Sequence, residues 1–339
     1  MRRKITILLL AVLAVVTSCQ RRPFSEHTTA VMMRFNIVTN VKSDVEVSNP
    51  VTFRLDLFDR QTGKTAYTDY LSAEGGYIYP RPGTYDFVVY NIDTESTIVR
   101  NQDEKATVEA YTNLIPDFLK SQMGAFLGSR EEYHKQLAAV RGEASKSPIT
   151  KDPVVEGTER IVNEPDYLYV GEIDALEIPA FDIDEPGEIV LDVDVSSVVE
   201  TWSISVGTFE GLQWVSSITA LITGQVASHY IGTRQKSEEV VTILFDMQKN
   251  DQEKRVKGYF NTFGKNPLYS SFLSLDLNII DNAGNPHHYH FDLTDQFFDN
   301  EEYYLEVETP IVIEEPKVEG GGFQPIVDPW DEVKTEINL

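Results

Sequence analysis

The chain has 339 residues and carries 54 acidic against 29 basic side chains, which gives a formal net charge of -25. A field of that sign repels phosphate and argues against nucleic acid or anionic lipid head groups as partners. Hydrophobic residues make up 41% of the chain, enough to build a sizeable core, and the length suggests two domains. The single cysteine, Cys19, excludes an intramolecular disulfide and a thiolate metal cluster.

The N-terminus has the pattern of a lipoprotein signal. Three basic residues at 2–4 precede an apolar run over 5–16, and small residues at 17–18 lead to Cys19. The run is too short to span about 30 Å of hydrocarbon as a helix. An ordinary secretory signal followed by a coincidental cysteine is the alternative interpretation. Resemblance to bacterial lipoprotein signals implies cleavage before Cys19 and acylation of its sulfur and new amine, with 1–18 as signal peptide and 19–29 as tether.

The residue after Cys19 is Gln20. Inner-membrane retention in well-studied Gram-negative bacteria is favoured by aspartate at that position. The signal therefore indicates an outer-membrane lipoprotein held by its lipid.

Residues 30–185 are expected to form a first β domain. Apolar and polar residues alternate over 53–57 and 85–89, which predicts half-buried strands, and 65–71 follows the turn at 59–63 as the second strand of a hairpin. Residues 145–165 are polar and contain three prolines, which predicts a surface loop, and 167–178 returns to strand-like sequence.

The period changes between residues 113 and 146. Ser129 and Glu132 form a capping-box pattern, and Tyr133, Leu137 and Val140 follow at helical spacing. We expect one or two short helices, inserted in the β domain.

A turn at 184–187 predicts a domain boundary near residue 185, with 186–339 as a second β domain. Alternation resumes over 189–195 and is cleanest over 273–279, where a turn at 281–286 leads to a returning strand over 289–293. Many short alternating strands with Gly, Pro and Asn turns predict an all-β fold of antiparallel sandwiches with a minor helical insertion.

Three histidines on the last of these strands are the only local candidates for metal ligands. His288 and His290 point to one face and His287 to the other, and Asp292 shares the face of the pair. Zinc could bind there, but a solvated strand face that carries polar histidines is the preferred interpretation. No metal and no cofactor are predicted.

The sequence signals for other kinds of site are weaker still. Acidic clusters at 182–185 and 299–302 lack the ordered spacing of an EF-hand loop, and no phosphate loop or nucleophile motif occurs. Paired carboxylates for glycoside hydrolysis remain open, because such pairs are defined in space. Trp202, Trp214 and Trp330 could stack on sugars, although packing is the commoner role of tryptophan. We expect no enzyme.

The second half resembles fimbrial anchor and accessory lipoproteins of Bacteroidales, the group of fimbrillin-associated base subunits. The lipoprotein signal and residues 85–93 add weaker support. Four stretches carry the resemblance: 220–227 (ALITGQVA), 259–264 (YFNTFG), 273–297 (LSLDLNIIDNAGNPHHYHFDLTDQF) and 320–339 (GGGFQPIVDPWDEVKTEINL).

The resemblance implies two transthyretin-like sandwich domains in a non-catalytic protein that anchors or terminates a fimbrium by β-strand addition to fimbrial subunits. The segment after Gly322, with apolar anchors at Ile326, Trp330 and 333–339, is either an exchange strand or the last strand of its own domain. Stalk subunits of the group lose an N-terminal strand at a basic residue. Arg34 lies inside a predicted strand, which favours a base or accessory role.

A surface glycan-binding lipoprotein of a polysaccharide-uptake system is the alternative. It would share the lipid signal, the acidity and the β domains. An aligned row of exposed Trp or Tyr would favour this function, and an open groove beside a sandwich edge would favour the fimbrial one.

The lipid is directly testable. In Cys19→Ala, incorporation of a fatty-acid label and membrane fractionation are both expected to be lost, because the acceptor sulfur is gone. Persistence of both would show that Cys19 is not acylated.

Overall fold

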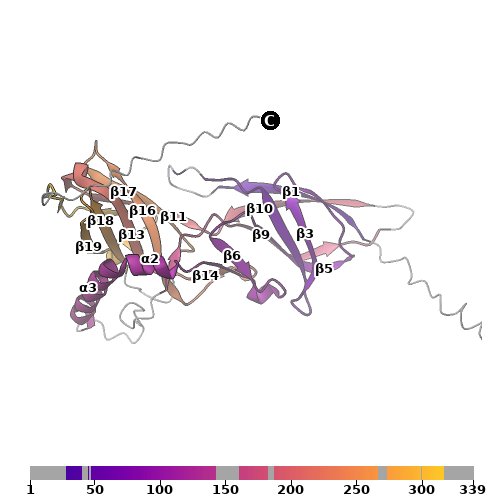
Figure 1. The fold of residues 1–339 in the computed structure, drawn as a ribbon. Helices are drawn as coiled ribbons and strands as arrows, with labels where there is room; N and C mark the ends of the chain where they lie inside the picture. The colour runs from indigo at the N-terminus through magenta and orange to yellow at the C-terminus, as the bar shows by residue number, and fades with distance from the viewer. Residues whose placement is uncertain are drawn as a thin grey trace, which may run out of the picture.

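The computed structural model describes residues 28–39, 45, 47–142, 160–181, 187–265, 273–298 and 300–316. They form two β-sheet lobes placed end to end, which confirms the all-β class (Figure 1). Cys19 and its tether, the acidic residues 182–185, Trp330 and the predicted exchange segment after Gly322 lie outside the described residues.

The first lobe is a seven-stranded sheet that curls around its own core. Its order is β3-β2-β5-β9-β10-β1-β4, and the two end strands, β3 and β4, contact each other. Strand β1 pairs with β10 in parallel, whereas the other pairs in this sheet are antiparallel. The strands are β1 (Ala30–Val38), β2 (Thr52–Asp59), β3 (Thr65–Ser72), β4 (Gly76–Ile78), β5 (Gly83–Asn91), β9 (Tyr169–Ile178) and β10 (Glu188–Ser197).

The second lobe is a sandwich whose two layers share one strand. Residues 240–246 of β16 pair with β13, and residues 247–250 pair with β17, so β16 passes from one layer to the other. Its strands are β8 (Ile161–Asn163), β11 (Glu200–Gly207), β13 (Val215–Val226), β16 (Val240–Asn250), β17 (Arg255–Thr262), β18 (Ser274–Asp281), β19 (Pro286–Asp292) and β20 (Tyr304–Val307), and β12 (Phe209–Glu210) and β21 (Ile311–Val312) pair beside it.

The core of this sandwich lies between the two layers. Residues of β13 and β18 face those of β11 and β17, and Trp202 is fully buried among aromatic rings, 4.6 Å from Phe297 between ring centroids. Trp214 packs against the same core. Two of the three tryptophans therefore have packing roles.

Helices cover the second lobe. The helices are α2 (Asp117–Gln122), α3 (Gly124–Gly142) and α4 (Thr294–Phe298), and two of them, α2 and α3, come from the stretch of chain between β5 and β9 of the first lobe. The expected helical insertion is confirmed, but α3 begins before Ser129, which lies inside the helix and caps nothing. Residues 145–165, expected to be loop throughout, contain strand β8, because β8 pairs in parallel with β16.

The predicted division into domains near residue 185 stays a prediction. By strand pairing, however, the sheets divide after Ser197, because β10 follows the turn and still pairs with β1 and β9 of the first lobe (Figure 1). Alternation along 189–195 identifies a strand but not its partner.

A third apolar cluster joins the two lobes. A four-stranded sheet of order β15-β14-β7-β6 spans the junction, and its β7 and β14 lie more than 100 residues apart in the sequence. The bounds are β6 (Thr97–Arg100), β7 (Glu109–Thr112), β14 (Ser228–Tyr230) and β15 (Gln235–Lys236). Tyr90 and Val170 of the first lobe pack here with Val199 of the β10–β11 connection and with Val226 and Phe263 of the second lobe.

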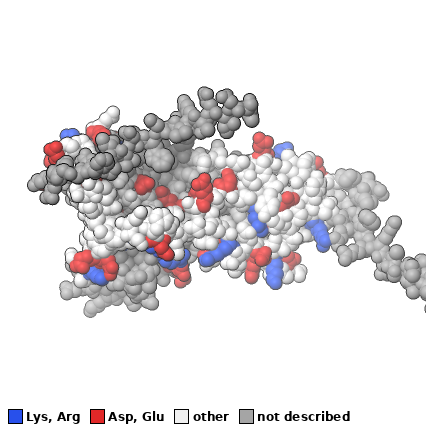
Figure 2. Space-filling view, in the orientation of Figure 1, with Lys and Arg blue, Asp and Glu red and all other residues white. Residues whose placement is uncertain are grey.

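Acidic and basic side chains are interspersed along the face drawn in Figure 2. No helix among the described residues is long and apolar enough to span a bilayer.

Glu164 provides a pH test of the junction. It is partly buried and accepts a hydrogen bond of 2.8 Å from the backbone N–H of Asn261. Burial, with Asp246 and Asp166 nearby, raises the pKa of its carboxyl from an ordinary 4.5 to about 7. The folded chain keeps a proton that the unfolded chain releases, so the contribution of Glu164 to stability falls as pH rises from 4.5 to about 7.

In Glu164→Gln this decline should disappear. Relative to the original chain, the free energy of unfolding of the variant should rise by about 1–3 kcal/mol as pH goes from 5 to 8. Each unit of pKa corresponds to about 1.4 kcal/mol, and the partial exposure of the carboxyl reduces the effect. Urea unfolding across that range measures the difference. Glu210→Gln on β12 removes the same charge from an exposed site, and an equal gain there would contradict the role of Glu164.

Candidate functional site

Helices cover the outer face of the layer formed by β16, β13, β18 and β19. This cover determines the surroundings of the predicted histidines. Leu244, Leu221, Asp276 and His290 stand side by side across β16, β13, β18 and β19. Apolar residues of the helical segment, including Phe126, pack on Leu221. The expected solvated strand face is therefore wrong, because α3 lies against β19 (Figure 1).

A buried ion pair fixes α3 on this face. Arg130 of α3 is 1% exposed and pairs with Asp276 of β18, which is fully buried. Burial opposes the ionisation of Asp276, but the charge of Arg130 and hydrogen bonds from His134 and His290 outweigh it and hold the pKa of the carboxyl well below its usual range. A paired, hydrogen-bonded charge is the form in which an ionised group is tolerated in a core.

His290 and Ser274 complete the network. His290 Nδ1 lies 2.9 Å from Asp276 Oδ1, and its Nε2 lies 3.0 Å from the hydroxyl of Ser129 on α3. Ser274 donates to Asp276 at 2.8 Å and lies 3.0 Å from His134 Nε2. His290 thus connects the edge strand to the helix.

The other predicted ligands are separated. His287 Nε2 lies 3.2 Å from Oδ2 of Asp281, the last residue of β18, on the opposite face of the sheet from His290. His288 lies against Phe126, 5.3 Å between ring centroids. In the described part of the chain, no three His, Cys, Asp or Glu side chains are placed to share a metal ion.

Strand β19 presents a free backbone edge. It ends the sheet order, and no further strand among the described residues pairs with it. Leu293 N–H donates to Leu273 and Asp281 N–H to Asn285, so the odd-numbered residues bond inward to β18. Because the pattern alternates in an antiparallel pair, the N–H and C=O groups of His288 and His290 point outward.

The opposite edge of the lobe is closed. Gln296 of α4 accepts from the N–H of Glu306 at 2.9 Å and donates to its C=O at 2.7 Å, as a neighbouring strand would. Asn300 donates to the C=O of Tyr304. These side chains satisfy the outer edge of β20, whereas His288 and His290 of β19 keep outward backbone groups that no described strand pairs with.

Exposed tyrosines occur on the first lobe. Tyr77 and Tyr79 are about half exposed and stack on each other at 6.4 Å between centroids. The Tyr77 hydroxyl donates to Glu188 at 3.0 Å. This stacked pair consists of two rings only. It is not the aligned row of aromatic side chains that would favour polysaccharide binding.

The buried pair predicts an asymmetric mutational response. Arg130→Met should lower the free energy of unfolding by about 3–5 kcal/mol, because it leaves the Asp276 charge buried and unpaired. Arg160→Met, which breaks the exposed pair with Glu239, should cost less than about 1 kcal/mol. Urea unfolding of both variants makes the comparison, and equal small losses would show that Arg130 does not hold the helix.

Comparison with known proteins finds a curated relative and solved structures that this chain resembles. A curated relative, a candidate fimbrium anchoring subunit Fim4B of Bacteroides ovatus, is 27% identical over 76% of this chain, and the match spans 64% of the relative's length. The crystal structure of a candidate adhesin from Bacteroides ovatus aligns with a TM-score of 0.57 and 22% identity, over 88% of this chain and 98% of that one, which shows a shared fold.

The fimbrial anchor protein Mfa2 of Porphyromonas gingivalis is a more distant structural relative. It aligns with a TM-score of 0.45 and 11% identity, over 84% of this chain and 90% of that one. At the level of the sequence family, the model described as a domain of unknown function, DUF5119, matches residues 18–246. That match covers more than half of the chain, and the protein therefore belongs to the DUF5119 family.

Proposed function

We propose that this protein attaches or terminates a fimbrium at the outer membrane by accepting a strand of a fimbrial subunit, and that it has no chemistry of its own. The free edge of β19 carries the proposal, because it offers outward backbone groups on a rigid, covered sheet. Similarity to a candidate fimbrium anchoring subunit supports the choice of partner.

The direction of β1 supports a tethered orientation. Strand β1 runs parallel to β10, and β10 ends at Ser197, which leads directly into β11 of the second lobe. Ala30 therefore begins at the end of the first lobe that is remote from the second. A lipid on Cys19 would then hold the first lobe near the membrane and leave β19 on the outer lobe.

The position of Arg34 supports a base or accessory role. Arg34 lies in the middle of β1, paired with Asp192 of β10, and its neighbours Val31 and Met33 are fully buried. Removal of the chain up to Arg34 would take Val31 and Met33 out of the core, at about 1.5–3 kcal/mol for each apolar side chain. Such a loss opposes the cleavage that stalk subunits undergo.

The test blocks the edge without changing the sheet. In His288→Pro one outward N–H is lost and the ring obstructs an added strand, whereas the inward bonds of β19 belong to odd-numbered residues. We expect fimbriae to be shed into the medium and attachment to weaken roughly tenfold or more. Electron microscopy and assay of fimbrial subunits in the supernatant measure this.

His288→Val is the matched control, since it loses the same imidazole but keeps the N–H. It should retain its fimbriae. Shedding in both variants, or in neither, would rule out strand addition at β19. Normal fimbriae in a strain that lacks the gene, together with lost growth on one polysaccharide, would favour the glycan-uptake alternative instead.

A further inference from the structure

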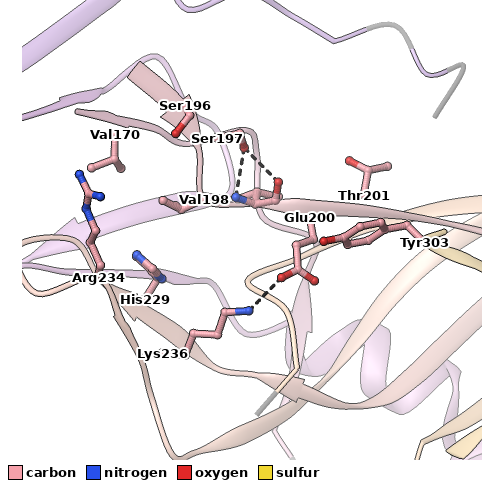
Figure 3. A pocket seen from close by; sticks show the side chains of 11 residues that line it. Val170, Ser196, Ser197, Val198, Glu200, Thr201, His229, Arg234, Lys236 and Tyr303 are labelled. Atoms are coloured by element: carbon pink, nitrogen blue, oxygen red, sulfur yellow. Dashed lines mark hydrogen bonds and ion pairs between the residues drawn. The ribbon is translucent and has the colours of Figure 1, made fainter. Parts of the chain in front are cut away.

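The junction of the two lobes contains a cleft of about 370 Å³ (Figure 3). This volume is near the lower end of the range for small-molecule sites. Its walls come from β9, from the β10–β11 connection, from β14 and β15, and from the segment before β20. The lining residues are Val170, 196–201, His229, Arg234, Lys236 and Tyr303.

His229 of β14 is the central polar group. Its side chain is 5% exposed, and neither ring nitrogen has a hydrogen-bond partner among the described residues. Figure 3 shows the ring directed into the cleft, between Lys236 and Arg234. Burial and these two cations lower the pKa of His229 to about 4, so the ring is neutral near pH 7.

A neutral imidazole has one N–H donor and one acceptor nitrogen. Leaving both unpaired in a buried position is costly, so a ligand or water that satisfies them is expected. Ser196, whose hydroxyl can both donate and accept, lines the same cleft and is partly buried. Arg234 is ion-paired through Nε to Glu172 at 2.9 Å.

The charges around the cleft are balanced. Lys236 pairs with Glu200 at 2.9 Å, as Arg234 does with Glu172, so a strongly charged ligand would gain little net attraction. Glu200 also accepts from the indole N–H of Trp202 at 3.4 Å, which leaves it poorly suited to bind a metal. An apolar ligand would leave His229 unpaired.

A hydroxyl group both donates and accepts, as His229 requires. We propose that the junction cleft binds one neutral sugar residue of a glycan, whose hydroxyls pair with His229 and Ser196 and whose ring lies beside Tyr303. The site is independent of strand addition, because β19 is on another part of the second lobe.

The probes are the methyl glycosides of glucose, galactose and mannose, and N-acetylglucosamine. They are tested at millimolar concentration against the full chain carrying Cys19→Ala, by saturation-transfer NMR and by the imidazole signals of His229. At least one sugar should bind and shift those signals. His229→Phe keeps the ring volume but removes both nitrogens, and it should weaken binding roughly tenfold or more.

Tyr230→Phe is the matched control, because Tyr230 is the next residue of the same strand and points to the other face. It should bind like the original chain. Circular dichroism checks the fold of each variant. If His229→Phe does not fold, Ser196→Ala tests the site instead, and it is expected to weaken sugar binding about threefold to tenfold. Binding by no probe, equal binding by His229→Phe, or binding only of an acidic peptide would each overturn the proposal.

Discussion

The apolar cluster between the lobes is the constraint on which the rest of the structure depends. Its members come from both large sheets and from the small sheet in which β7 and β14 pair, so neither lobe ends in an independent surface. Because Val170 and Val199 lie at the same packed junction, the chain that passes from β10 to β11 is held on both sides. The cleft with His229 is a gap in this packing that is bordered by polar groups.

A second constraint is the need to cover both faces of β13. Ala220 and Ile222 face the sandwich core, whereas Leu221 between them faces the helices. The helical segment supplies that cover, and the Arg130–Asp276 pair selects its position, since burial of either charge alone would be expensive. In the part of the chain that the structure describes, no strand pairs with the outer edge of β19, and α3 covers the face of that strand.

Periodicity predicted most of the strands and the helical insertion correctly. The hairpin over 273–293 is the clearest example, because its apolar residues alternate and its turn contains Asn282, Gly284 and Asn285. Alternation did not reveal that Asp276 and His290 lie beneath a helix, since a buried polar face and a solvated one have the same pattern. The unbroken apolar run at Ala220–Ile222 was the available signal for a sheet covered on both faces.

The junction cleft could not be predicted from the sequence. His229, Ser196 and Arg234 belong to no motif, and their elements meet at the junction where β7 pairs with β14 and β10 pairs with β9. Partner choice between strands depends on packing over long separations, which local pattern does not contain.

The parallel pairing of β1 with β10 has a mechanical consequence. A membrane tether would pull on β1 at its N-terminal end, whereas a partner on the outer lobe would pull on β10 through its C-terminal end. In a parallel pair these forces act along the strands in opposite directions, which is a shear geometry. The nine residue pairs from Ala30–Glu188 to Val38–Ser196 would then resist together rather than separate one after another, as a zipper does.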